Sequence, residues 1–100
     1  MNALATLNDQ FRKSWSEVIF TQGIISAVSN HFILAQVIES FCLFNEDNDP
    51  YGEHDFGALE LEGQRILWKI DYYDQTLQHW CDPLDTRCRR VLTVLLASEY

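Results

Sequence analysis

The chain has 100 residues, of which 47% are hydrophobic and 13% aromatic, and these values suit one compact domain over residues 1–100. Its 15 acidic and 7 basic residues give a formal net charge of −8. This charge disfavours direct binding to nucleic acid and to anionic membranes, because both are polyanions, and it favours a partner with a basic surface. An acidic composition also serves solubility alone, so the charge leaves both interpretations open.

No apolar run approaches the roughly 20 residues that span a membrane, and the N-terminus lacks the basic and apolar regions of a signal peptide. The three cysteines, Cys42, Cys81 and Cys88, are too few, and odd in number, for a disulfide framework. We therefore expect a cytoplasmic protein without disulfides. Cys42 and Cys88 are expected to pack as small apolar side chains.

The first segment carries an apolar residue at every third or fourth position: Leu4, Leu7, Phe11 and Trp15. This spacing predicts an amphipathic helix over about residues 3–15, with Asn8 and Arg12 on its other faces. Residues 17–21 are β-branched and aromatic, and this composition favours a short strand. Each of these two elements would present one apolar side to a core.

Two further helices are predicted. Apolar residues at helical spacing favour one over about residues 26–42, with Ser26 or Ser29 as its N-cap. The last stretch of the chain is strongly apolar and follows Pro83. It predicts a mostly buried helix over about residues 86–98.

The most regular pattern predicts a β-hairpin with strands at about residues 54–61 and 64–72. Glu62-Gly63 forms a two-residue turn between them and sets the register. Gly57 then lies opposite Trp68, which leaves room for the indole ring. The same register gathers one apolar face: Leu59, Leu61, Ile66, Trp68 and Ile70.

The register also places opposite charges across the strands, Glu60 with Arg65 and His54 with Asp71. Two strands do not fold alone, so the predicted helices must cover the apolar face. The sequence thus predicts an α+β domain, in which a small antiparallel sheet built on the hairpin is covered by three helices.

The segment before the hairpin concentrates carboxylates and contains no Lys or Arg: Glu46, Asp47, Asp49, Glu53 and Asp55. The hairpin is expected to bring Asp71 and Asp74 near them, and Tyr51 lies within a turn of the same segment. A row of carboxylates can engage the Lys and Arg side chains that would otherwise clamp DNA. We therefore predict a partner-binding surface made of these residues: Glu46, Asp47, Asp49, Tyr51, Glu53, Asp55, Asp71 and Asp74.

The sequence gives less support to a metal site or a catalytic site. A calcium loop starting at Asp47 lacks the acid needed at Tyr51 and the glutamate needed at Ala58. The possible zinc ligands do not follow a known spacing: His54, His79, Cys81 and Cys88. His54 with Asp55 or Asp71 resembles a base and its orienting carboxylate, but no nucleophile motif accompanies it. We expect no catalytic residue, no metal and no cofactor.

Two long stretches carry a resemblance: residues 45–74, NEDNDPYGEHDFGALELEGQRILWKIDYYD, and residues 91–100, VLTVLLASEY. With the opening LNDQFRKSW and TQGI, they resemble a family of small proteobacterial proteins of unknown function, often borne by plasmids or phages. Its pattern reads NDP-x-GEHDFG, then WKIDYYD, then a C-terminal helix. The resemblance implies no activity and no catalytic residues.

In size, charge and genetic setting the chain also resembles inhibitors of type I CRISPR surveillance complexes. The resulting expectation is a non-enzymatic inhibitor. Its acidic surface would bind the basic groove of a nucleic-acid-handling protein, as an anti-CRISPR that blocks DNA binding. The alternative is a small housekeeping or plasmid-maintenance domain with a ligand or cation site near His54 and Asp71.

Overall fold

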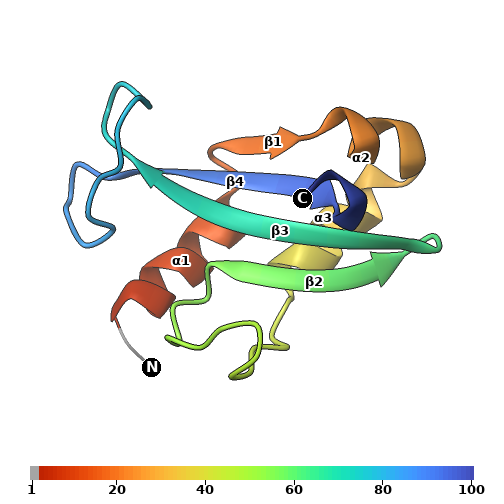
Figure 1. The fold of residues 1–100 in the computed structure, drawn as a ribbon, viewed down its shortest axis with the longest axis horizontal. Helices are drawn as coiled ribbons and strands as arrows, with labels where there is room; N and C mark the ends of the chain where they lie inside the picture. The colour runs from red at the N-terminus through yellow and green to blue at the C-terminus, as the bar shows by residue number, and fades with distance from the viewer. Residues whose placement is uncertain (1–2) are drawn as a thin grey trace.

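The computed structural model describes residues 3–100 as a four-stranded sheet with three α-helices (Figure 1). The elements in chain order are α1 (Ala3–Ser14), β1 (Val18–Phe20), α2 (Gln22–Ala27), α3 (His31–Glu39), β2 (Phe56–Leu61), β3 (Gln64–Tyr73), β4 (Arg89–Leu96) and the 3-10 helix η1 (Ala97–Glu99). The strand order is β1-β4-β3-β2. The α+β class is confirmed, but the sheet is mixed, because β1 runs parallel to β4.

The predicted hairpin is confirmed in both its turn and its register. Glu62 and Gly63 have φ values of 53° and 73°, and a type I′ turn requires positive φ at both positions. Gly57 pairs with Trp68, and a Cβ atom at position 57 would lie 2.4 Å from the indole nitrogen. Helices α1 and α3 lie behind the sheet in Figure 1 and cover its apolar face. Trp68 on that face is fully buried.

The predicted helix over residues 86–98 is wrong, because this segment forms β4 and η1. The strand lies between β1 and β3, and both of its faces are covered along much of its length. Val91 and Leu95 are buried on one face, and Leu92 and Val94 on the other. A strand buried on both faces reads as a continuous apolar run, which periodicity cannot distinguish from a buried helix.

The predicted helix over residues 26–42 is divided into α2 and α3. Their N-caps are Thr21 and Asn30 rather than Ser26 or Ser29. The Ser29 backbone N–H and hydroxyl instead donate to the carboxylate of Glu62 in the hairpin turn, at 3.0 and 2.7 Å. This contact ties the end of the hairpin to the start of α3.

Helix α1 packs Phe11 of its apolar stripe against the core, and Trp15 just after the helix packs there too, but the stripe is not the most buried side of the helix. The residues that it buries are Ala5, Asn8 and Arg12, whereas Leu7 is 39% exposed. The sequence assigned Asn8 and Arg12 to other faces, and the structure corrects this. Both side chains find hydrogen-bond partners inside the molecule, which is the condition for burying polar groups.

Among residues 3–100, no helix is long and apolar enough to cross a membrane. The three cysteines are present as thiols. Cys42 is exposed and Cys88 only partly buried, so the expected packing of Cys42 in the core is wrong.

Candidate functional site

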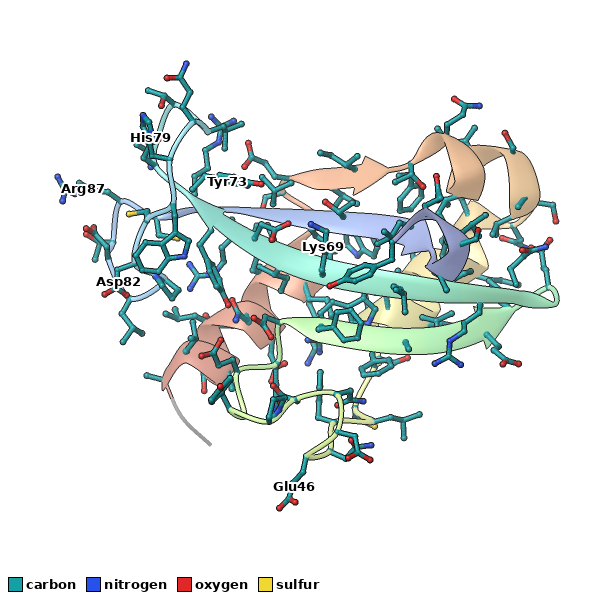
Figure 2. All side chains as sticks on the ribbon, viewed as in Figure 1. Glu46, Lys69, Tyr73, His79, Asp82 and Arg87 are labelled. Atoms are coloured by element: carbon teal, nitrogen blue, oxygen red, sulfur yellow. The ribbon has the colours of Figure 1, made fainter. Side chains whose placement is uncertain are left out.

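The predicted acidic surface separates into parts that face different surroundings. Glu46, Asp47 and Tyr51 form what we call the loop tip, and all three are exposed, Tyr51 by 81%. Figure 2 shows Glu46 pointing away from the body of the protein, beyond β2. Within residues 3–100, no cation lies within ion-pair distance of the Glu46 or Asp47 carboxylate.

Asp49 is only 8% exposed and holds the loop together. Its Oδ1 atom accepts hydrogen bonds from the backbone N–H groups of Glu53 and His54, at 2.9 and 3.2 Å. His54 has a φ of 57°, a strained value for a residue with a side chain, and these bonds help to hold it there. Asp49 is therefore placed to shape the loop rather than to meet a partner.

His54 does not pair with Asp71, contrary to the sequence prediction. Its Nδ1 atom lies 3.0 Å from the carboxylate of Asp9 on α1, and its Nε2 atom lies 3.7 Å from Asp49. The ring stacks on Phe44 with a centroid distance of 3.9 Å. The left-handed backbone at His54 turns the chain out of the strand direction, so β2 begins only at Phe56 and the pairing with Asp71 cannot form.

Arg12 connects α1 to the end of α3. Its guanidinium donates to the carbonyls of Ile38 and Phe41 at 3.0 and 3.2 Å, and to Asp9 at 2.9 Å. It also lies over the ring of Trp68, 5.1 Å from the centroid. Cations are favourable at helix C-termini, so Arg12 is both an electrostatic and a packing element.

A second polar network joins α1 to β3 and β4. The Asn8 side-chain amide donates to the Tyr72 hydroxyl at 2.8 Å, and its oxygen accepts from Arg90 at 2.8 Å. The Tyr72 hydroxyl in turn donates to Asp55 at 3.5 Å. Burial, and then repulsion from Asp55 and Glu53, raise the pKa of Tyr72 well above its ordinary value.

Glu53 and Asp55 have raised pKa values for related reasons. Burial, followed by repulsion from Asp55, raises the pKa of Glu53. Burial, and then repulsion from Asp49, raises the pKa of Asp55. The folded state therefore binds protons more tightly than the unfolded state. The free energy of unfolding therefore falls as pH rises from the ordinary carboxyl pKa through the raised one. At neutral pH both carboxylates are ionised, and the whole of this loss of stability is present.

We expect Glu53→Gln to increase the free energy of unfolding at neutral pH by up to about 1 kcal/mol, the range of partly exposed charge interactions. The gain should disappear near about pH 3, where the carboxyls are protonated in both states. Urea unfolding at the two pH values measures it, with Glu60→Gln on β2 as the control. A gain of equal size at both pH values would contradict this origin.

The last two predicted site residues lie away from the loop tip. Asp71 forms an ion pair with Lys69 at 2.6 Å, on the face of β3 opposite Trp68. Asp74 follows Tyr73 and accepts from the backbone and hydroxyl of Thr76, at 3.0 and 2.7 Å. Figure 2 shows Tyr73 at the upper left, at the end of β3, and Glu46 at the bottom, beyond β2, so the hairpin does not bring this end of β3 to the loop tip.

A hollow of about 380 Å³ lies beside His54 and is lined by Asp9, Lys13, Cys42 and Phe44, among others. An imidazole held by a carboxylate can act as a base, but no hydroxyl or thiol forms a hydrogen bond with His54 among the described residues. Within residues 3–100, no three His, Cys, Asp or Glu side chains gather in a way that could hold a metal ion.

The sequence did not predict several residues of these networks as site residues, namely Asn8, Asp9, Arg12, Tyr72 and Arg90. Searches of the curated proteins and of the solved structures find no match to this chain. Residues 20–99 match the model of a family described as protein of unknown function (DUF3768), and the chain therefore belongs to that family.

Proposed function

We propose that this protein is a non-enzymatic binding protein that docks on a basic surface of another protein. The observation that supports this most is the loop tip, where Glu46 and Asp47 are exposed and no cation of residues 3–100 lies within ion-pair distance of them. Carboxylates that serve the fold are bonded to it, as Asp49 is. Within residues 3–100 the Glu46 and Asp47 carboxylates form no comparable bond, which leaves them available to a partner.

The distribution of the basic residues strengthens this negative field. Four of the cationic side chains form ion pairs with the chain's own carboxylates: Arg12, Lys69, Arg87 and Arg89. Each of these cations is neutralised by a nearby carboxylate, so Glu46 and Asp47 belong to the excess of acidic groups that gives the whole chain its net charge of −8. Such a field accelerates association with a basic partner and weakens as salt rises.

The finer proposal concerns the partner. A groove that binds DNA presents Lys and Arg side chains at phosphate spacing, and exposed carboxylates can occupy the same positions. We propose that the loop tip mimics DNA in the groove of a CRISPR surveillance complex. The protein would act in the bacterial cytoplasm as an anti-CRISPR factor carried by a phage or plasmid.

The test replaces Glu46 and Asp47 together with glutamine. We expect this variant to lose inhibition of target-DNA binding by a type I surveillance complex, measured by electrophoretic mobility, because the paired Lys and Arg lose their counterions. Thermal stability should stay near that of the natural chain, since neither carboxylate has a bond within residues 3–100. Asp82→Lys is the matched control, because it changes the net charge by the same amount at an exposed site elsewhere.

Full inhibition by the double variant would reject the loop tip as the contact. The second candidate function would then take precedence, a small domain that binds a ligand in the hollow beside His54. The observation in its favour is the imidazole held between Asp9 and Asp49 at the edge of that hollow. The sequence predicted this ligand site near both His54 and Asp71. Asp71, however, lies on the face of the sheet opposite Trp68.

A further inference from the structure

Strand β2 forms one edge of the sheet, and half of its backbone groups point outward. The Ile70 N–H donates to the Asp55 carbonyl at 2.8 Å, which makes residues 55 and 70 a hydrogen-bonded pair. In an antiparallel ladder such pairs alternate. The groups of Phe56, Ala58 and Glu60 therefore face away from β3, and no partner for them is found within residues 3–100.

This edge lacks the features that usually prevent a strand from pairing with another chain. Exposed edges are commonly protected by proline, by lysine, by a bulge or by short length. Strand β2 spans six residues, FGALEL, and pairs without interruption with β3. Its single charged residue is Glu60, which is exposed and forms no ion pair with Arg65 opposite, among the described residues.

A groove of about 450 Å³ runs beside the same edge. It lies between β2, the C-terminal half of α3 and the segment that follows α3. Its lining is mostly apolar and includes Val37, Leu43, Ala58 and Leu59, with Leu43 71% exposed. Among the described residues that line it, Glu60 is the only charged one. An apolar groove beside unpaired backbone groups is the arrangement that binds an extended peptide as an added strand.

We propose that β2 accepts an extended segment of the partner protein as a fifth strand, and that this segment alternates apolar and basic residues. Side chains alternate across a strand, so the apolar ones would enter the groove while the others lie beside Glu60 on the opposite face. The proposal rests on the proposed function, because it adds a second contact for the same basic partner.

Charge argues for a basic segment and against a second copy of this chain. The loop tip lies beyond β2, on the side of this edge (Figure 2). A second copy would bring its own net charge of −8 to the interface. A segment with Lys or Arg at alternate positions would instead meet Glu60 at short range and the loop tip at longer range.

The experiment uses a capped ten-residue peptide of alternating lysine and valine, titrated into ¹⁵N-labelled full-length protein. Binding should slow hydrogen exchange at the amides of Ala58 and Glu60. Ala58→Pro removes one outward N–H without breaking the ladder to β3, a position where an edge strand tolerates proline. It should weaken binding by about tenfold or more. Ala58→Val keeps the N–H and is the matched control.

Three outcomes separate the edge from the loop tip. Loss of peptide binding in Ala58→Pro supports the edge as the binding site. If the glutamine double variant at Glu46 and Asp47 binds the peptide as tightly as the natural chain does, the loop tip is rejected as a contact for the peptide and the edge is not. Binding that weakens in the double variant and not in Ala58→Pro overturns the edge and leaves the proposed function standing. Absence of peptide binding also overturns the edge.

Two controls test which kind of molecule pairs with the edge of β2. A peptide of alternating glutamate and valine should not bind, and equal binding by it would overturn the basic character of the segment. Sedimentation of the protein alone should show a monomer. A dimer that Ala58→Pro dissociates would identify a second copy as the occupant and overturn the proposal.

Discussion

Replacing Trp68 with alanine is expected to lower the free energy of unfolding by about 3–5 kcal/mol. The indole is fully buried, and Phe41 and Phe44 meet it edge-on at centroid distances of 5.4 and 6.0 Å. Arg12 lies over the face of the ring. Removing the ring leaves a cavity that these neighbours cannot fill by small movements, because each is held by its own contacts.

Urea unfolding followed by circular dichroism measures this loss as a lower midpoint. Trp80→Ala is the matched control, because the Trp80 side chain is 71% exposed in the segment that connects β3 and β4. Its removal should leave the midpoint nearly unchanged. Equal midpoints for Trp68→Ala and the natural chain would reject the place of Trp68 at the centre of the core.

Replacing Arg12 with alanine is expected to cost about 3–5 kcal/mol, the range for breaking a buried charged pair by removing one partner. The side chain is 2% exposed, and its loss leaves the carbonyls of Ile38 and Phe41 without their donor. Asp9 would keep only its contact with His54. The C-terminus of α3 would lose both of its hydrogen bonds to Arg12, so the effect extends beyond one contact.

Chemical unfolding of Arg12→Ala and of Lys13→Ala provides the comparison. Lys13 is the next residue on α1 and is exposed, so its substitution removes the same charge without opening the interior. Its effect should lie within about 0.5 kcal/mol of zero. Similar unfolding curves for the two variants would show that the buried contacts of Arg12 contribute little.

The hairpin could be predicted from the sequence because its determinants are local. A two-residue turn ending in glycine fixes the register, and the register decides which side chains share a face. The predicted pairs from Phe56 with Lys69 to Leu61 with Gln64 are all found. Strand β4 could not be recognised in the same way, because its assignment depends on neighbours on both sides that are distant in sequence.

The candidate site was predictable only in part. A run of carboxylates without cations identifies an acidic loop, and Glu46 and Asp47 are exposed as such a loop suggests. Which carboxylates turn inward depends on α1, which buries Asn8 and Arg12 more fully than Leu7 of its hydrophobic stripe. The one available signal was the spacing of Asn8 and Arg12, which are four residues apart and so share a helix face. It becomes meaningful only once their distant partners are known.

The position of β4 has a consequence for biosynthesis. This strand lies inside the sheet, yet it is the last of the four strands to leave the ribosome. Until then, β1 has no partner and β3 has only β2. Contacts that join residues 18–20 to residues 92–94 close a loop of most of the chain, which is slow and entropically costly. The nascent chain must therefore wait with apolar surface uncovered, a period in which chaperones bind such segments.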